Sequence, residues 1–413
     1  MPPLQRAELY LELVDRIAAL GQKNQVEILL RKATEETLRV EWPDSRVLLL
    51  MNLAEHYLKS EIQEYQWKGL ALLDQAVSEA EFVREGRDIA VFSKLGAIFD
   101  QLGQSKQSQE YFKKSIASVK IASFHNYGGH GKWGAIAHYL ALIGRYEEGR
   151  QVARQETSPG LFVDALLGMA KGARLRGDYQ TGISFLDKAS DHAFENIRIA
   201  ETQDQKTLAY YLIGEITREY VECGEYEKAL SLIEVLPAWK ALGVRPFLAG
   251  KMAKKGENEK AAYLLLEEYA ASKKTQSTHA GFLFVEAQFL LHQEKGAIPV
   301  LSQIKLAAEE QAKVRQSYEI ITLYTSLAGW YFRIGNPATG LDLLRVALDL
   351  IKNETFDSDK AELYIEIAFI LATEIPDPSR EGTTLLQELD LEASQLKDFG
   401  SYSPEGVLLE SPH

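Results

Sequence analysis

Three histidines near the middle of the chain, His125, His130 and His138, come closest to the spacing of a metal site. Imidazole nitrogens hold Zn²⁺ when they recur at a short spacing and a carboxylate or further ligand completes the set, as in His-Glu-x-x-His. Here the spacings are five and eight residues, and no such motif is present. We therefore predict loop or surface histidines and no metal site.

Cys223 is the single cysteine, which excludes an intramolecular disulfide framework and a cysteine-cluster metal site. It precedes Gly224 and is flanked by Glu222 and Glu225. Negative charges beside a thiol raise its pKa and so reduce the reactive thiolate. The sequence predicts a packed, unreactive thiol.

The glycine-dense stretch Gly128-Gly129-His130-Gly131 has the composition of a phosphate cradle, but no strand precedes it and no Lys-Ser/Thr follows. A flexible linker is favoured over a phosphate site. No Gly-x-Ser-x-Gly elbow, dinucleotide motif or kinase motif set occurs. Acidic pairs such as Glu147-Glu148 fit solvated helix faces better than acid/base pairs. We therefore predict no catalytic centre and no cofactor.

Charge and hydropathy exclude further classes of function. The 413 residues include 59 acidic and 46 basic side chains, a formal net charge of −13, which disfavours non-specific binding to nucleic acid or anionic lipid. No uncharged apolar run approaches the ~18 residues of a membrane span. The first residues, Met1 to Gly21, mix charged side chains into the apolar ones, unlike a secretory signal. A cytoplasmic location is the expectation.

The elements that position these residues are predicted to be helices. Most of the 12 prolines lie between apolar-periodic stretches rather than inside them. Apolar residues recur at steps of three and four, as from Leu166 to Ala173, and no sustained alternating run indicates a strand. The sequence therefore predicts an all-α protein.

A short glycine turn recurs along the chain, and a fixed period decides the architecture of a repeat protein. From Gly103 to Gly256 the spacings between turn glycines are 41, 33, 47 and 32 residues, and intervals of 82 and 79 residues on either side fit two units each. Weaker turns fall near 61–65, 292–296 and 376–379. We therefore predict about ten helix-turn-helix units, with turn glycines at Gly21, Gly103, Gly144, Gly177, Gly224, Gly256 and Gly335.

The same residue types stand at fixed distances before each turn glycine. Eight residues earlier the residue is large and apolar, seven earlier it is mostly small, and four earlier it is usually large. A small residue lets two helices approach closely, and glycine can take a positive φ at a helix end. This register predicts tight antiparallel helix pairs that bury their apolar faces by stacking on one another.

These positions resemble tetratricopeptide repeats. The resemblance rests on segments such as Leu95-Gly96-x-x-Phe99-x-x-x-Gly103, Ile216 to Ala229 and Leu327 to Ala347, and it covers roughly residues 6 to 395. Units of about 39 residues are longer than the family's 34 and are similar to its long-repeat, bacterial-type variant of about 40 residues. The resemblance implies a right-handed α-α superhelical solenoid of about ten repeats.

The predicted organisation has four parts. Residues 1–122 hold repeats 1–3, residues 123–131 form the glycine-rich linker, residues 132–395 hold repeats 4–10, and residues 396–413 form a flexible tail rich in serine, glycine and proline.

The resemblance also implies that the first helix of each unit lines a concave groove. Positions six and two or three residues before the turn glycine would face it, and here they carry His138, Lys171, Arg174, Arg218 and Lys254. We predict a basic stripe that binds an acidic or carboxylate-bearing peptide segment by charge-assisted hydrogen bonds.

Chance remains an alternative for this stripe, since the cations could instead pair with Asp164, Glu215 or Glu222. The asparagines of the family's carboxylate clamp are missing at the matching positions, which disfavours a chaperone C-terminus as the guest. Small residues at Gly134, Gly214, Gly243 and Gly250 are expected to leave room for a guest backbone.

The predicted function is therefore that of a non-enzymatic scaffold or adaptor for protein–protein interaction, which binds a protein or peptide, does not bind nucleic acid and does not span a membrane. Two alternatives stay open. The chain could be a regulator gated by a peptide ligand, or a non-catalytic subunit or assembly factor of an enzyme complex.

Overall fold

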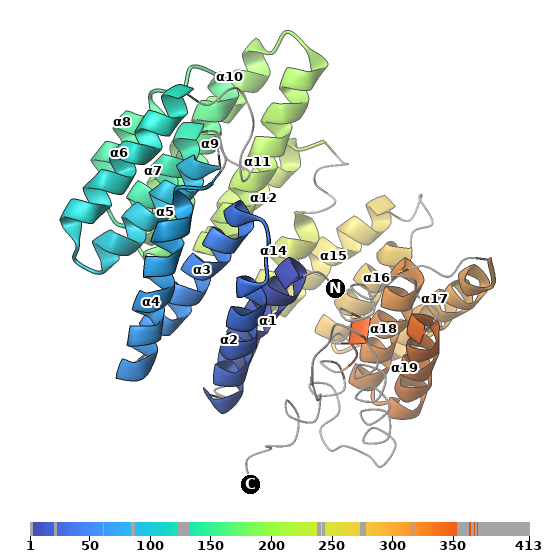
Figure 1. Cartoon of the computed structure of the whole chain (residues 1–413). Helices are drawn as coiled ribbons and strands as arrows, with labels where there is room; N and C mark the ends of the chain where they lie inside the picture. The colour runs from blue at the N-terminus through green and yellow to red at the C-terminus, as the bar shows by residue number, and fades with distance from the viewer. Residues whose placement is uncertain are drawn as a thin grey trace. The chain divides into compact units, whose positions relative to one another are not determined.

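The protein is described by a computed structural model that defines residues 3–352, apart from 20–22, 61, 84–86, 122–131, 238–240, 242–243, 273–277 and 315–317, together with residues 363, 364, 367 and 370. Within these residues all regular secondary structure is helical, in 18 long helices (Figure 1). The prediction of an all-α protein is confirmed.

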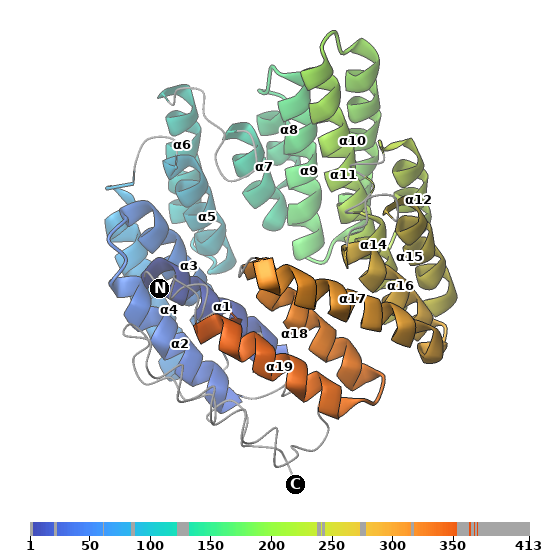
Figure 2. The ribbon, with the colours of Figure 1, turned by 90° about the vertical axis from the view of Figure 1, so that its right-hand side faces the viewer.

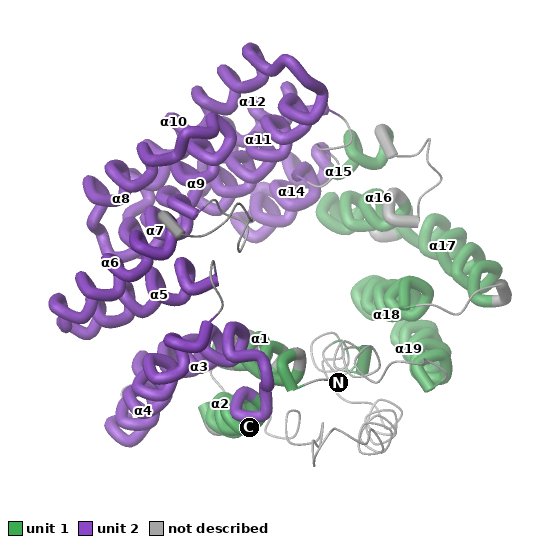
Figure 3. The backbone as a smooth tube through the Cα atoms, turned by 45° about the horizontal axis from the view of Figure 1, so that its top comes forward, with its two compact units in different colours: residues 1–36, 265–413 green, residues 37–264 purple. Residues whose placement is uncertain are grey.

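The chain divides into two compact units, residues 37–264 and residues 1–36 with 265–413, and each is described by itself (Figure 3). The first unit contains α3 (Pro43–Leu58), α4 (Gln63–Ala80), α5 (Asp88–Gln101), α6 (Ser105–Ile121), α7 (Lys132–Leu142), α8 (Tyr146–Ala153), α9 (Pro159–Leu175), α10 (Tyr179–Ile199), α11 (Gln203–Cys223), α12 (Tyr226–Val235) and α14 (Arg245–Lys254). The second contains α1 (Pro3–Ala19), α16 (Thr278–Leu290), α17 (Glu294–Val314), α18 (Tyr318–Arg333) and α19 (Pro337–Lys352). Two helices cross the division, α2 (Lys23–Leu38) and α15 (Asn258–Ser272).

Neighbouring helices pack in pairs along the chain. In residues 37–264 the pairs are α3/α4, α5/α6, α7/α8, α9/α10 and α11/α12, and each first helix also contacts the next first helix, in the order α3, α5, α7, α9, α11 and α14. Figure 3 shows the second helices α6, α8, α10 and α12 along the other side of this row. The predicted helix-turn-helix repeat is therefore confirmed.

The turns have the geometry that the glycines predict. All six described turn glycines have positive φ, between 74° and 90°. After each, the next residue donates a backbone hydrogen bond to the carbonyl four residues before the glycine, as Glu225 does to Tyr220 at 2.9 Å. This is the Schellman arrangement, which satisfies carbonyls left open at a helix end. The weak turn predicted near 292–296 is the same structure with His292 in the glycine position, at φ 54°.

The predicted register matches the core. The large apolar residues eight positions before the six turn glycines are fully buried: Leu95, Ile136, Met169, Ile216, Leu248 and Leu327. The small residue one position further along lies where two helices meet closely, since a β-carbon on Gly96 would come within 2.9 Å of the Phe112 ring.

The second unit has its own core among α16 to α19. Buried residues such as Leu301, Tyr324 and Leu344 form one apolar cluster, and Figures 1 and 2 show α18 and α19 side by side. Leu363, Tyr364 and Ile367 belong to the same cluster. They fall in the predicted tenth repeat, most of which lies outside the described residues.

The predicted boundaries fall only partly within the described residues. The linker at 123–131 and the tail at 396–413 lie outside them. The helices on either side of the linker, α5 and α7, contact each other, so the row of first helices continues across that position.

Candidate interaction surface

The five predicted binding residues lie on four consecutive first helices. His138 is on α7, Lys171 and Arg174 are on α9, Arg218 is on α11 and Lys254 is on α14. We call the surface of these helices that carries the five residues the first-helix face. Because the helices contact one another in sequence order, residues at the same register form rows across them.

Polar side chains link successive first helices across this row. Lys94 Nζ of α5 lies 2.7 Å from Glu55 Oε2 of α3. Arg174 Nε of α9 lies 2.9 Å from Glu219 Oε2 of α11. Further along, Lys251 Nζ of α14 lies 2.8 Å from Glu222 Oε1 of α11. These ion pairs connect first helices to one another and contribute to the stacking of the repeats.

Two of the five predicted residues are engaged in such links. His138 Nδ1 lies 2.9 Å from the carbonyl oxygen of Gly168, across the contact of α7 with α9. Arg174 forms the ion pair with Glu219, in which both side chains are largely buried. Burial lowers the pKa of Arg174, but the hydrogen bond and charge of Glu219 outweigh burial and raise it above its ordinary value. Arg174 is therefore a charged structural residue.

The other three predicted residues are more available. Arg218 is exposed, and its ion pair is a loose one, 3.9 Å to Glu215 on its own helix. Lys254 is exposed and Lys171 is half-buried. In the part of the chain that the structure describes, no hydrogen bond or ion pair engages either lysine.

The first-helix face is therefore less basic than the sequence indicates. Glu215 pairs with Arg218, which was an alternative that the sequence left open, and Glu222 pairs with Lys251, which is not among the five predicted residues. Glu219 was missed. It lies five residues before its turn glycine, and the residue at that register in α9, Gly172, packs directly against the preceding first helix. That register could have indicated a side chain aimed at a neighbouring helix rather than at a guest.

The glycines expected to leave room for a guest differ in their surroundings. Gly134 is buried, and its carbonyl would lie 3.1 Å from a β-carbon on Gly168, so it serves the contact of α7 with α9. Gly214 is also buried. Gly250 has open space beside it among the described residues. Gly243 lies outside them.

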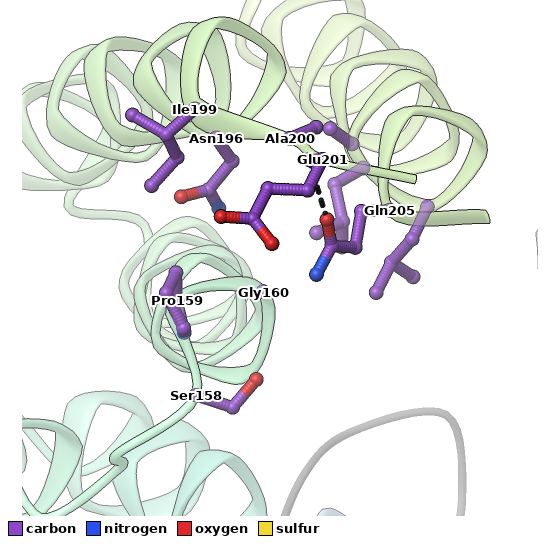
Figure 4. A pocket seen from close by; sticks show the side chains of 11 residues that line it. Ser158, Pro159, Gly160, Asn196, Ile199, Ala200, Glu201 and Gln205 are labelled. Carbon is purple, nitrogen blue, oxygen red and sulfur yellow. Dashed lines mark hydrogen bonds between the residues drawn. The ribbon is translucent and has the colours of Figure 1, made fainter. Parts of the chain in front are cut away.

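A cavity of about 360 Å³ lies beside the start of the first helix α9 (Figure 4). It lies between the start of α9, the end of α10 and the first turns of α11. Its lining combines apolar side chains with amide groups and one carboxylate: Ser158, Pro159, Gly160, Asn196, Ile199, Ala200, Glu201, Gln205, Leu208, Ala209 and Leu212. No motif in the sequence indicated it, because its walls come from three helices.

Three other predictions concern metal binding, the thiol and the membrane. Among the described residues, no three His, Cys, Asp or Glu side chains are grouped so as to hold a metal ion. Burial, then the charge of Glu219, raises the pKa of Cys223 to about 11, the direction expected from sequence. Of the helices described, none has the length and apolar composition needed to cross a bilayer.

Helix pairs, positive-φ turn glycines and a row of first helices together define a helical-repeat protein of the tetratricopeptide-like type. No family model matches the sequence, and no curated protein matches it.

Several solved structures are similar to this chain at low sequence identity. The tetratricopeptide domain of P58(IPK) is 15% identical, covering 94% of this chain and 99% of that one, with a TM-score of 0.21. The apo quorum sensor NprR from B. thuringiensis is 15% identical over 84% of this chain and 97% of its own, with a TM-score of 0.29. Ton1535 from Thermococcus onnurineus NA1 is 17% identical over 94% and 86%, with a TM-score of 0.29. Such scores establish no shared overall arrangement, so the class rests on the helix pairs and turns themselves.

Proposed function

We propose that the protein is a non-catalytic scaffold or adaptor whose first-helix face binds a segment of a partner protein. The observation that carries this proposal is the uninterrupted row of first helices from α3 to α14. Such a row offers a long continuous surface that a compact domain of the same mass lacks. Specific interfaces bury ~800 Å² on each partner, and a stack of repeats supplies that area without a separate binding domain.

The composition of the face supports a protein segment as the guest. The cross-helix ion pairs fix the positions of its charged groups, so that little side-chain freedom is lost on binding. Lys171 and Arg218 stand among these fixed pairs, and no described residue of a neighbouring helix forms an ion pair with either. A partner carboxylate placed between them would form charge-assisted hydrogen bonds. The proposed guest is therefore a segment with at least one acidic residue.

The test begins with purification of the intact protein from its native host and identification of the protein that accompanies it. That partner is then titrated against a variant carrying Lys171→Glu and Arg218→Glu. We expect its affinity to fall at least about tenfold, because a carboxylate would then face like charges. Helical content and the melting curve should be unchanged, since neither cation forms a cross-helix pair.

A matched control reverses two charges on second helices, Lys113→Glu on α6 and Lys188→Glu on α10, which are both exposed. The net charge of the two variants is the same, so non-specific electrostatic attraction changes equally. If the partner binds the two variants with equal affinity, the first-helix face is not the binding surface.

A further inference from the structure

The cavity at the start of α9 contains an unused hydrogen-bond donor. The Nδ2 atom of Asn196, at the end of α10, is buried and has no hydrogen-bond partner among the described residues. A buried amide nitrogen without an acceptor is destabilising, so native proteins pair most such groups. The neighbouring carboxyl-bearing residue Glu201 is exposed and does not supply that acceptor. Because the atom has almost no accessible surface, an acceptor from a guest would satisfy this donor once the Asn196 amide turns toward the cavity.

Further donors surround the same space. Gln205 uses Oε1 to accept the backbone N–H groups of Glu201 at 2.8 Å and of Thr202 at 3.1 Å, which leaves its Nε2 group on the cavity side (Figure 4). At the start of α9, the side chain of Ser158 forms no capping hydrogen bond. The first N–H groups of a helix have no acceptor within the helix, and Gly160, which carries one of them, lines the cavity. The cavity therefore offers hydrogen-bond donors from α9, α10 and α11 to a guest.

The remaining walls are apolar and partly in contact with water. Ile199 and Leu208 are 50% and 51% exposed. Gly160 keeps the entrance clear, because a β-carbon there would lie 3.1 Å from Leu208 Cδ2. A volume of about 360 Å³ is at the low end of the ~300–1,000 Å³ range of ligand pockets. These features fit one bulky apolar side chain together with the peptide carbonyls beside it.

The rim of the cavity carries a negative charge, and a positive charge lies further along α9. Glu201 lies at the rim, which disfavours an acidic residue at the cavity itself. Lys171 lies on the same face of α9 as Gly160, since 11 residues make about three helical turns, and it is ~16 Å away. Asp164 lies between them but is 7% exposed and already has an interaction partner. An extended chain rises ~3.3 Å per residue, so ~16 Å is about five residues.

We propose that this cavity is the anchor site for the partner segment. One bulky apolar side chain of an extended peptide enters it, a peptide carbonyl accepts a hydrogen bond from Asn196 Nδ2, and an acidic residue about five positions away pairs with Lys171. This inference rests on the proposed function and adds to it the chemical pattern of the segment.

The experiment selects short random peptides displayed on phage against the intact protein, and then measures the selected peptides by fluorescence anisotropy. Selected sequences should share a bulky apolar residue and an acidic residue about five positions apart. Ala200→Trp, at the rim where α10 ends, should fill the cavity and weaken these peptides about thirtyfold, the loss typical of a removed interface anchor. Asn196→Leu, which keeps the size but removes the donor, should weaken them about three- to tenfold.

Lys188→Trp on the exposed side of α10 is the matched control and should leave the affinity unchanged. If Lys171→Glu with Arg218→Glu abolishes binding while Ala200→Trp and Asn196→Leu do not, the anchor site is wrong and the first-helix face stands. If no peptide is enriched, or enriched peptides bind all variants equally, both proposals fail. A different outcome would be that no peptide is enriched, while a small acid such as hexanoate stabilises the wild type but not Ala200→Trp. That result would identify a metabolite site and overturn the anchor proposal.

Discussion

Replacing Cys223 with arginine is expected to stabilise the contact between the α9/α10 repeat and the α11/α12 repeat. Cys223 directly precedes turn glycine Gly224, and the preceding turn contains Gly177 and Tyr179. No described atom lies within 4 Å of the position of a β-carbon on Gly177, and Tyr179 is 49% exposed. The turn is therefore uncovered, and Cys223 is too short to reach it.

The molecule covers the equivalent turns on either side with a cation from the same register. Arg176 lies over Gly144, where a β-carbon would be 2.8 Å from its Cζ. Lys255 lies over Gly224 in the same way, with Nζ 2.9 Å from the β-carbon position and 4.6 Å from the ring centre of Tyr226. Tyr226 is only 9% exposed. An arginine at position 223 would therefore lie over the turn at Gly177, as Arg176 lies over Gly144 and Lys255 lies over Gly224.

The size of the effect follows from the interactions that the guanidinium would form. A cation over an exposed aromatic ring contributes ~0.5–1 kcal/mol. A cation in the last turn of a helix adds ~0.3–1 kcal/mol through the helix dipole, while ordering the long side chain costs up to ~1.5–2 kcal/mol at full immobilisation. Since the side chain stays partly exposed, only part of that cost applies. A net gain of about 0.5–1 kcal/mol in the free energy of unfolding is expected.

Urea unfolding of the single and double variants measures this gain. Cys223→Met supplies a long uncharged side chain as the control, and Tyr179→Leu removes the ring. The gain from Cys223→Arg should disappear in the Tyr179→Leu background, which gives a coupling of about 0.5–1 kcal/mol. Equal stabilisation by methionine and arginine, or a gain that persists without the ring, would refute the covering role of the cation.

Three further predictions concern stability. His292→Gly should raise the free energy of unfolding by about 1 kcal/mol, because the residue has a φ of 54°, and urea unfolding measures it. Gly172→Ala should lower the free energy of unfolding by ~1–3 kcal/mol or more, since its β-carbon would lie 2.4 Å from a backbone oxygen of α7. Gly250→Ala should raise it by ~0.5–1 kcal/mol, because the space beside Gly250 on α14 is open. Thermal melts of the two variants compare them directly. Burial raises the pKa of Asp187, but the hydrogen bonds from Lys228 and Tyr220 outweigh burial and hold it below its ordinary value. Asp187 should therefore stabilise the protein relative to Asp187→Asn at pH 7, and this difference should be lost as the pH falls below ~4. Urea unfolding of both proteins at pH ~7 and below pH ~4 measures it.

The helices and turns could be predicted because their determinants are local. A glycine at positive φ ends six of the described first helices, so the positions of these turns follow from the sequence. The turn at His292 was only weakly predicted, because the left-handed residue there is not glycine. A second column of small residues, five after each turn glycine, was missed although the sequence contains it: Ser108, Gly149, Gly182, Ala229, Ala261 and Gly340. These residues pack against the first helix, as Gly182 does with its β-carbon position 3.2 Å from the carbonyl oxygen of Ala170.

The candidate site was less predictable, because it depends on which helix each side chain meets. Sequence register placed Arg174 toward a guest, but the contact of α9 with α11 brings it to Glu219. The cavity depends on the ends of α9 and α10 and the start of α11, so no single repeat encodes it. The unused donor of Asn196 becomes visible only when its surroundings are known.

The availability of Lys171 follows from the residue next to it. In α11 and α14 the position five before the turn glycine carries Glu219 and Lys251, and both reach the preceding first helix. In α9 that position is Gly172, and its missing side chain allows α7 and α9 to approach so closely that a β-carbon would lie 2.4 Å from the carbonyl oxygen of His138. With no room for an ion pair there, the two helices are joined by His138 and a backbone carbonyl instead. The contact that is too close for a charged pair is thus the one beside which Lys171 stays available for the proposed guest.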